Sequence, residues 1–446
     1  MKHATFIEYA GTNTPRYTSY PTAVQFHDGI DAGVFADWLA ALDPAGKGSL
    51  YIHIPYCREM CWYCGCSTRA TTRREPVAAY LEKLIGEIAI TAAYIPHRPR
   101  IGHVHLGGGT PTILDPDQFG RLMACLDQHF DIGPDAEKAI EIDPRTFSPE
   151  LARQLARSGI NRASIGVQTF DRGVQSRINR IQSFETVRDC VSDLREAGIS
   201  SISMDLLYGL PGQTIESCVG TVALARSLSP GRLSVFGYAH VPHMRRHQNL
   251  IRTADLPDAT ARVAQALEIA DALEQAGYVP VGIDHYARSE DPLAILARSG
   301  GVRRNFQGYT TDRSDYLIGF GASAISHLPQ GYAQNTLDVR AWSEAVSAGR
   351  NAICRGFALS DDDRMRGAII EQLMSGLEAD VPGVASAYGL APPQPDLSDL
   401  EQDGLVDMRA SGIRIPEQNR MLARIVASRF DAYWQSDRAG RHSNSV

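Results

Sequence analysis

The sequence lacks any long uninterrupted hydrophobic run, so no segment provides the roughly 20 apolar residues of a membrane-spanning helix. The segment from Met1 to Gly11 also lacks the apolar centre of a signal peptide, and we therefore expect a cytoplasmic protein. An excess of positive charge is missing too. The formal net charge of −7 argues against non-specific binding to nucleic acids. With 43% hydrophobic and 21% charged residues, the composition is that of a globular enzyme.

Cysteine is scarce, and its distribution is uneven. Of eight cysteines, four lie in one segment of the sequence, IPYCREMCWYCGC, as Cys57, Cys61, Cys64 and Cys66. The other four are scattered singly among apolar neighbours: Cys125, Cys190, Cys218 and Cys354. Thiols stay reduced in the cytoplasm, which favours metal ligands over disulfides for the clustered group. Thiolates this close in sequence would repel one another unless a metal or cluster neutralised them.

A regular alternation of strands and helices begins near residue 50. Short apolar, β-branched runs predict six buried strands, at residues 50–54, 103–106, 139–142, 162–167, 201–207 and 232–238. Between them, Asp115-Pro116 and Ser148-Pro149 predict helix starts, and Gly159 and Gly198 predict helix ends. Six strands that each precede a helix indicate parallel βα units. We expect a partial (β/α)6 TIM-like barrel, with a doubly wound open sheet as the alternative.

Polar and glycine-rich positions gather directly after these predicted strands. They include the cysteines, the run GGGTP at 107–111, Glu141, Gln168, Asp205 and Ala239. In a barrel, the loops that follow the strands meet on one rim, where active sites are built. The pattern therefore predicts an enzyme.

The two ends of the chain do not share the alternation of strands and helices. At 446 residues, the chain is too long for one small core. We expect an N-terminal extension or lid over residues 1–45, the barrel and its extension over residues 46–355, and a small, mostly helical C-terminal domain over residues 356–446.

The spacing C-x3-C-x2-C of Cys57, Cys61 and Cys64 suits an iron–sulfur cubane with one open iron. Each thiolate would bind one iron, and the fourth iron would remain free for a small chelating ligand. The alternative is a zinc ion held by these three cysteines and Cys66. Against zinc, Cys64 and Cys66 are only two residues apart, whereas zinc loops usually separate paired cysteines by at least two residues.

Cys57, Cys61, Tyr63 and Cys64 resemble the C-x3-C-x-aromatic-C motif of the radical S-adenosylmethionine superfamily, and the run GGGTP resembles its glycine-rich stretch. Within that superfamily, the chain is similar to the oxygen-independent coproporphyrinogen III oxidases from about residue 12 to 340. The matching runs are RYTSYPTA (16–23), CWYCGC (61–66), EIDPR (141–145), IGVQ (165–168), DLLYGLP (205–211), DH (284–285), RNFQGYTT (304–311) and GASAI (321–325).

The resemblance implies a [4Fe–4S] cluster on Cys57, Cys61 and Cys64 and S-adenosylmethionine at the barrel rim. It implies that the cluster-bound molecule contacts Tyr51, Gly108, Glu141 and Ile325, and that a second molecule contacts Tyr63, Gly109, Thr110, Gln168, Arg180, Asp205 and Ala239. Structural explanations compete with some of these roles: Tyr51 and Ile325 are suited to a core, and Arg180 is suited to a solvated helix.

The reaction implied is the conversion of two propionates of coproporphyrinogen III to vinyl groups, giving protoporphyrinogen IX, by a 5′-deoxyadenosyl radical. No side chain is expected to act in proton transfer. The resemblance further implies a monomer, an electron donor such as flavodoxin or ferredoxin, and an unidentified electron acceptor. The alternative is a haem chaperone of the same branch. Cys66 and the N-terminal run at 16–23 argue against it, because those chaperones carry an aromatic residue at this cysteine position and lack the extension.

A substrate with four carboxylates calls for guanidinium groups near the rim. The candidates in the sequence are Arg16, Arg145, Arg303 and Arg304.

Overall fold

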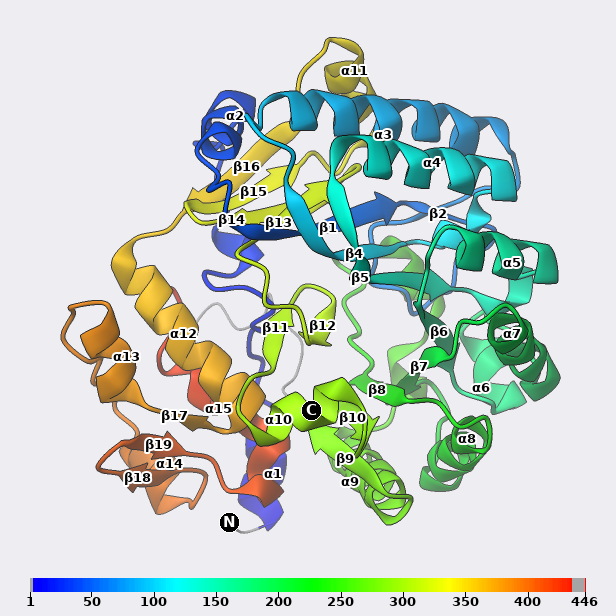
Figure 1. The fold of residues 1–446 in the computed structure, drawn as a ribbon. Helices are drawn as coiled ribbons and strands as arrows, with labels where there is room; N and C mark the ends of the chain where they lie inside the picture. The colour runs from blue at the N-terminus through cyan, green and yellow to red at the C-terminus, as the bar shows by residue number, and fades with distance from the viewer. Residues whose placement is uncertain (1–2, 435–445) are drawn as a thin grey trace.

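The fold is built on one curved sheet that carries helices on its outer side (Figure 1). The structure, a computed structural model, describes residues 3–434 and residue 446. Within this part of the chain, twelve strands form the sheet in the order β16-β15-β14-β13-β1-β4-β5-β6-β7-β8-β10-β9.

The middle of the sheet confirms the six predicted strands. These are β1 (Lys47–Ile54), β4 (Arg100–Gly108), β5 (Asp131–Ile142), β6 (Arg162–Gln168), β7 (Ser201–Tyr208) and β8 (Arg232–Gly237). They are parallel neighbours in chain order. Right-handed crossovers between strands in chain order all fall on one face of the sheet, whereas a doubly wound sheet reverses direction partway. The architecture is therefore the predicted partial barrel.

Helices between these strands cover the convex face of the sheet, as Figure 1 shows. They are α3 (Glu75–Ala93), α4 (Pro116–His129), α5 (Pro149–Arg157), α6 (Arg172–Arg177), α7 (Phe184–Glu196), α8 (Ile215–Ser227) and α9 (Ala259–Gln275). The predicted helix starts are confirmed: Asp115 accepts a hydrogen bond from Gln118 N, and Ser148 accepts one from Leu151 N. Gly159 and Gly198 follow α5 and α7 with positive φ, as expected at helix ends.

Further strands extend both edges of the sheet or form small separate sheets of two or three strands. The strands of the large sheet are β9 (Tyr278–Val281), β10 (His285–Arg288), β13 (Tyr316–Phe320), β14 (Ile325–Leu328), β15 (Gly331–Asn335) and β16 (Ile353–Ala358). The separate ones are β2 (Tyr56–Cys57), β3 (Arg69–Ala70), β11 (Arg303–Asn305), β12 (Gly308–Thr310), β17 (Glu378–Ala379), β18 (Asp407–Arg409) and β19 (Gly412–Arg414).

The remaining helices lie at the ends of the chain and around the added strands. They are α1 (His3–Ala10), α2 (Ala32–Ala40), α10 (Pro292–Arg298), α11 (Val339–Ser347), α12 (Asp361–Gly376), α13 (Val381–Ala387), α14 (Ser398–Gln402) and α15 (Ala423–Ser428). Short 3-10 turns are η1 (Ala23–Gln25), η2 (Pro111–Ile113), η3 (Pro144–Thr146), η4 (Arg246–Leu250), η5 (Thr253–Asp255) and η6 (Glu417–Leu422).

The N-terminal and C-terminal segments meet on the side of the barrel away from α3 and α4 (Figure 1). Helix α1 packs against α9 of the barrel and against η6, while α15 packs against α12. Of the helices in the described ranges, none is both long and apolar enough to cross a membrane.

Alternation along β1 separates the core from the interior of the barrel. Leu50, Ile52 and Ile54 are almost fully buried among core side chains. Tyr51 and His53 point to the other face, because successive side chains of a strand alternate. The barrel interior is therefore lined by a different, more polar set of residues.

A buried carboxylate connects α3 to the strands that follow the barrel. Glu87, 2% exposed, accepts hydrogen bonds from Gly321 N at 2.6 Å and from Asn335 Nδ2 at 2.6 Å. Burial raises the pKa of Glu87 to about 7, against the hydrogen bonds that favour its ionised form. The carboxylate thus ties the turn after β13 and the end of β15 to the outer helix layer.

This raised pKa predicts a specific pH dependence of stability. Between pH 4.5 and 7 the unfolded state loses its Glu87 proton while the folded state retains it, so rising pH favours unfolding. The free energy of unfolding of the wild type minus that of Glu87→Gln should therefore fall over this range and level off above it. Denaturant unfolding at several pH values measures the difference. Glu82→Gln, a change at an exposed position of the same helix, is the control and should not produce this fall. The prediction would be contradicted if the difference in unfolding free energy between the wild type and Glu87→Gln rose with pH.

Candidate functional site

Strand register brings a layer of polar side chains together inside the barrel. Tyr51 of β1 is level with His105 of β4, and Gly166 of β6 is level with Asp205 of β7. Glu141 of β5 lies between these pairs of strands. His105, Glu141 and Asp205 all line one cavity of about 450 Å³, together with Ser164 and Ser234. The interior is therefore a polar chamber that can hold a ligand.

Glycines of the run after β4 give the backbone and a carboxylate room to approach. A Cβ on Gly107 would come within 2.7 Å of Glu141 Oε1. A Cβ on Gly109 would come within 2.6 Å of Tyr56 O, where the cysteine loop begins. Gly109 N donates to Ile54 O at 2.8 Å, so the two neighbouring strand ends are joined directly. Gly109 requires glycine because the approaching atoms belong to the backbone, whereas a side chain at position 107 would displace the Glu141 carboxylate.

Two carboxylates inside the chamber have different electrostatic surroundings. Glu141 accepts a hydrogen bond from Gly108 N at 3.1 Å, and its Oε1 lies 3.2 Å from His105 Nε2. Although burial alone would raise the pKa of Glu141, His105 and the Gly108 amide lower it. Burial and the charge of Glu141 instead raise the pKa of Asp205 to about 6. Glu141 is therefore ionised at neutral pH, whereas Asp205 changes its protonation state near pH 6.

The cysteine loop leaves β1 through β2 and lies against the loop between α6 and α7. Trp62 N donates to Ile178 O at 2.9 Å, and Asn179 Nδ2 donates to Met60 O at 2.9 Å. Thr71 N donates to Cys57 O at 2.8 Å, which pairs β3 with β2. The loop is thus held at several points by backbone hydrogen bonds.

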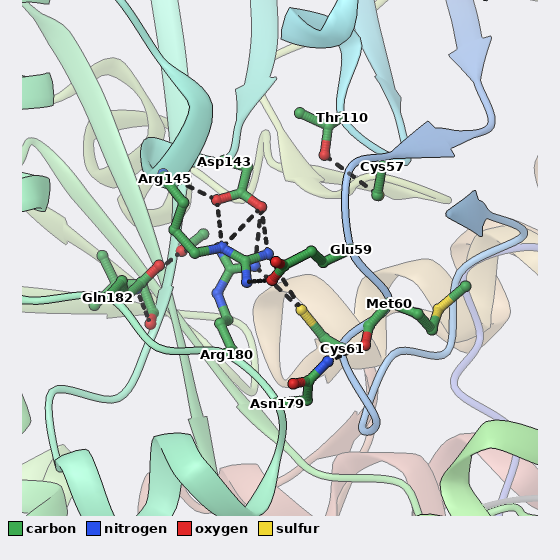
Figure 2. A network of polar contacts seen from close by, with 12 residues as sticks. Cys57, Glu59, Met60, Cys61, Thr110, Asp143, Arg145, Asn179, Arg180 and Gln182 are labelled. Atoms are coloured by element: carbon green, nitrogen blue, oxygen red, sulfur yellow. Dashed lines mark hydrogen bonds and ion pairs between the residues drawn. The ribbon is translucent and has the colours of Figure 1, made fainter. Parts of the chain in front are cut away.

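Asp143 and two arginines form the polar centre behind this loop (Figure 2). Arg145 Nη2 lies 2.6 Å from Asp143 Oδ2, and Arg180 Nη1 lies 3.4 Å from the same oxygen. Both guanidinium groups also reach Cys61 Sγ, each at 3.5 Å. Burial would raise the pKa of Asp143, but Arg180 and Arg145 hold it below its ordinary value. The network brings fixed positive charge to one sulfur of the loop.

The sulfur atoms of Cys57 and Cys64 have weaker donors. Thr110 Oγ1 donates to Cys57 Sγ at 3.3 Å, yet burial raises the pKa of this thiol to about 11. Cys66 N lies 3.4 Å from Cys64 Sγ, and hydrogen bonding from Cys66 lowers the pKa of Cys64. Cys66 therefore favours the thiolate form of Cys64.

These sulfur environments suit an iron–sulfur cluster. In the residues that the structure describes, no three His, Cys, Asp or Glu side chains are gathered tightly enough to hold a single metal ion. A cubane makes a different demand, because each thiolate binds its own iron atom. Cys57, Cys61 and Cys64 lie on one loop, and hydrogen-bond donors reach all three sulfur atoms. Such donors stabilise thiolates and a negatively charged cluster.

The structure also places the other predicted cofactor residues. Arg180 is 6% exposed and lies in the loop after α6, so it is not a solvated helix residue. Its Nη2 donates to Gly166 O at 2.5 Å, and Tyr63 is among the groups that raise its pKa. Gln168 has a positive φ at the end of β6, and its amide lies close to Gly166. These residues therefore gather beside Cys61.

Tyr63 and Ala239 are joined through one side chain. Gln248 Nε2 donates to Tyr63 O at 2.9 Å and to Ala239 O at 3.2 Å.

Tyr51 stacks on His105 with ring centroids 5.9 Å apart, and its hydroxyl lies 3.0 Å from His53 Nδ1. Tyr51 and Ile325 are only partly buried, which distinguishes them from the fully buried core.

Only two of the four predicted carboxylate-binding arginines line the chamber. Arg16 and Arg304 do. Arg145 is instead engaged with Asp143 and Cys61, and the exposed Arg303 is absent from the lining. The structure therefore gives Arg145 and Arg303 positions outside the chamber lining, unlike the sequence-based expectation that they bind substrate carboxylates.

Sequence reasoning missed three contributors to the site. His105 could have been found from its position two residues before Gly107, which places both on the inner face of β4. Arg262 and Arg424 line the chamber from α9 and α15. No local pattern distinguishes these two arginines from surface residues, because only the tertiary structure turns their helices toward the chamber.

Comparisons with known proteins agree with this geometry. Residues 51–225 match the radical SAM superfamily. The chain is 48% identical over 432 residues to the oxygen-independent coproporphyrinogen III oxidase of Bradyrhizobium diazoefficiens, covering 96% of each chain. It is 40% identical to the protein of that name from Salmonella typhimurium, covering 94% of this chain and 93% of the relative.

A solved structure is similar over nearly the whole fold. The coproporphyrinogen III oxidase of Escherichia coli, described as a radical SAM enzyme, is 37% identical with a TM-score of 0.88, covering 95% of this chain and 100% of that chain. The cysteine loop, the glycine-rich turn and the polar chamber thus occur in a chain that matches these relatives from end to end. The protein belongs to the oxygen-independent coproporphyrinogen III oxidase family of the radical SAM superfamily.

Proposed function

We propose that the protein converts two propionates of coproporphyrinogen III to vinyl groups without oxygen, giving protoporphyrinogen IX. It is an oxidoreductase that uses a [4Fe–4S] cluster and S-adenosylmethionine. One observation carries the proposal: Cys66 of the cysteine loop, Glu141 and Asp205 line the same chamber. Cluster loop, cofactor-binding carboxylates and substrate space therefore share one enclosure.

Cys57, Cys61 and Cys64 would hold the cluster. When bound, the cluster and S-adenosylmethionine would supply a 5′-deoxyadenosyl radical for abstraction of a propionate hydrogen atom, and an electron acceptor would take up the electron released with carbon dioxide. The protein residues bind and orient the reactants and exclude water, and none is assigned a proton-transfer role. Arg145 and Arg180 hold the loop and place positive charge near Cys61 Sγ.

The same placement supports a proposal for the S-adenosylmethionine contacts. For the cluster-bound molecule, we propose Tyr51, Gly108, Glu141 and Ile325; Glu141 is ionised and suited to an ammonium group. For a second molecule, we propose Tyr63, Gly109, Thr110, Gln168, Arg180, Asp205 and Ala239. Support comes from the gathering of Tyr63, Gln168 and Arg180 beside Cys61.

The proposal also covers the domain organisation of the chain. We divide it into an N-terminal extension over residues 1–45 that covers the chamber, a barrel over 46–355 and a C-terminal domain over 356–446. Arg16 and Thr18 in the chamber lining support the covering role. We place the enzyme in the cytoplasm as a monomer that receives an electron from a protein such as flavodoxin or ferredoxin.

Anaerobic incubation with coproporphyrinogen III, S-adenosylmethionine and a chemical reductant tests the function. Chromatography after oxidation should reveal protoporphyrin IX, and carbon dioxide should form in proportion. Absence of a vinyl product together with tight haem binding would favour the haem chaperone of the same branch instead.

Cysteine substitutions should separate cluster ligands from the other thiols. Cys57→Ala, Cys61→Ala and Cys64→Ala should each lose most cluster iron after anaerobic reconstitution, because each removes one iron ligand. Cys66→Ala should retain it, and Cys354→Ala, which removes an exposed cysteine outside the loop, is the matched control. Iron analysis and visible absorbance measure the outcome. Full iron retention by any of the first three variants would remove that residue from the ligand set.

Asp205 should make cofactor binding depend on pH. Its pKa of about 6 means that the accepting carboxylate form becomes dominant as pH rises from 5 to 7. Affinity of the reconstituted enzyme for S-adenosylmethionine should therefore increase about tenfold over this range, and Asp205→Asn should abolish the increase. Glu137→Gln, which removes another carboxylate of the chamber, should preserve it. Binding that strengthens toward acid pH would contradict the role of Asp205.

A further inference from the structure

One part of the chamber is lined by arginines from four separate segments. Arg16 belongs to the N-terminal extension, Arg262 to α9, Arg304 to β11 and Arg424 to α15. We call these four residues the arginine cluster. The extension, the barrel, the added hairpin and the C-terminal helix all contribute, so the cluster exists only in the folded chain.

One side-chain carboxylate in the described chamber lining, Asp284, lies within ion-pair distance of the arginine cluster. Its Oδ1 lies 3.7 Å from Arg304 Nη1, and Arg16 also lowers its pKa. Burial alone would raise the pKa of Asp284, yet Arg304, His285 and Arg16 lower it to about 2. Asp284 is therefore fully ionised and paired with Arg304.

Backbone oxygens and aromatic rings occupy other donors of these arginines. Arg262 Nη1 donates to Tyr238 O at 3.0 Å, and its Nε and Nη2 donate to Val446 O at 3.3 and 3.2 Å. Arg16 Nη2 donates to Gly237 O at 3.4 Å, and Arg304 lies over the Tyr309 ring at 4.5 Å. The contacts of Arg16 and Arg304 orient their guanidinium groups without cancelling their charge.

The positive charges of the cluster also act on one another. Burial, followed by the nearby Arg16, lowers the pKa of Arg424 to about 10. Burial lowers the pKa of Arg16 as well, and Arg304 and Arg262 add to this. Holding like charges together in a partly desolvated chamber costs free energy, which an anion bound between them would offset. Arg16 is accessible to solvent through the chamber and can therefore meet a ligand.

We propose that the arginine cluster binds propionate carboxylate of coproporphyrinogen III, and that it holds a propionate other than the one under reaction. This inference rests on the proposed function. Guanidinium groups bind carboxylates through paired, charge-assisted hydrogen bonds. Glu141, Asp205 and Cys66 line the part of the same chamber assigned to the cofactors, so a carboxylate at the arginine cluster would anchor the macrocycle while another propionate reacts.

Binding of a stable substrate analogue to the reconstituted holoenzyme tests the proposal. The probe is coproporphyrin III, the oxidised tetracarboxylate, titrated by fluorescence; its uncharged tetraamide is the comparison ligand. Arg16→Gln and Arg304→Gln should each raise the Kd for coproporphyrin III about 10- to 100-fold, since charge-assisted hydrogen bonds are lost. For the tetraamide, the change should stay below about threefold, because no carboxylate is present to lose its partner.

Matched variants separate this role from folding and net charge. Arg303→Gln removes an exposed positive charge from the neighbouring position of β11 and should bind coproporphyrin III as the wild type does. Arg16→Lys retains the charge and should bind with intermediate affinity. Thermal unfolding identifies any variant that fails to fold. Arg16 lies in the N-terminal extension, outside the packed hairpin, and so provides a readout if Arg304→Gln is unstable.

Two results would overturn the proposal. In the first, folded Arg16→Gln and Arg304→Gln bind coproporphyrin III as tightly as the wild type does. In the second, both variants lose as much affinity for the tetraamide as for coproporphyrin III. The function itself is judged separately, on the wild type. If the wild type forms the vinyl product while both variants bind normally, the function stands and the carboxylate role of the cluster is wrong. If the wild type forms no vinyl product, the function is wrong.

Discussion

The candidate site depends on one buried carboxylate, Asp143, shared by Arg145 and Arg180. These side chains come from the end of β5, from η3 and from the loop after α6, and both arginines reach Cys61 in the cysteine loop. Burying three charged groups is costly unless they are paired, and here each arginine has the carboxylate within ion-pair distance. The pairing therefore holds the cysteine loop against the barrel and brings positive charge to Cys61 Sγ.

A second constraint is the polar interior of the barrel. In a packed TIM barrel, apolar side chains fill the centre. Here glycine at position 107 makes room for Glu141, and His105, Ser164 and Asp205 line open space. Strand β10 beyond β8, the separate hairpin β11–β12 and the segments at both ends of the chain line this space from outside the six βα units. Arg16 and Arg424 show this directly, since they reach the chamber from opposite ends of the sequence.

Predictions from local pattern agreed well with the fold. All six inner strands, the capped starts of α4 and α5 and the glycines after α5 and α7 were found, because alternation, capping and positive φ depend on neighbouring residues. Pairing of β2 with β3 and addition of β13 beside β1 were not predicted. Such short strands carry weak patterns, and their partners lie far away in sequence or around a loop.

The sequence by itself determined the chemistry. The spacing of Cys57, Cys61 and Cys64 indicates a cluster with an open iron, and the runs around them identify the family. Only the tertiary structure decided which charged residues serve the site. Arg145 and Arg303 looked equivalent to Arg16 and Arg304 in sequence, yet the first binds Asp143 and the second faces solvent. Arg262 and Arg424 gave no signal at all. Motif spacing is a property of neighbouring residues, whereas the direction in which an arginine points depends on the packing of distant elements.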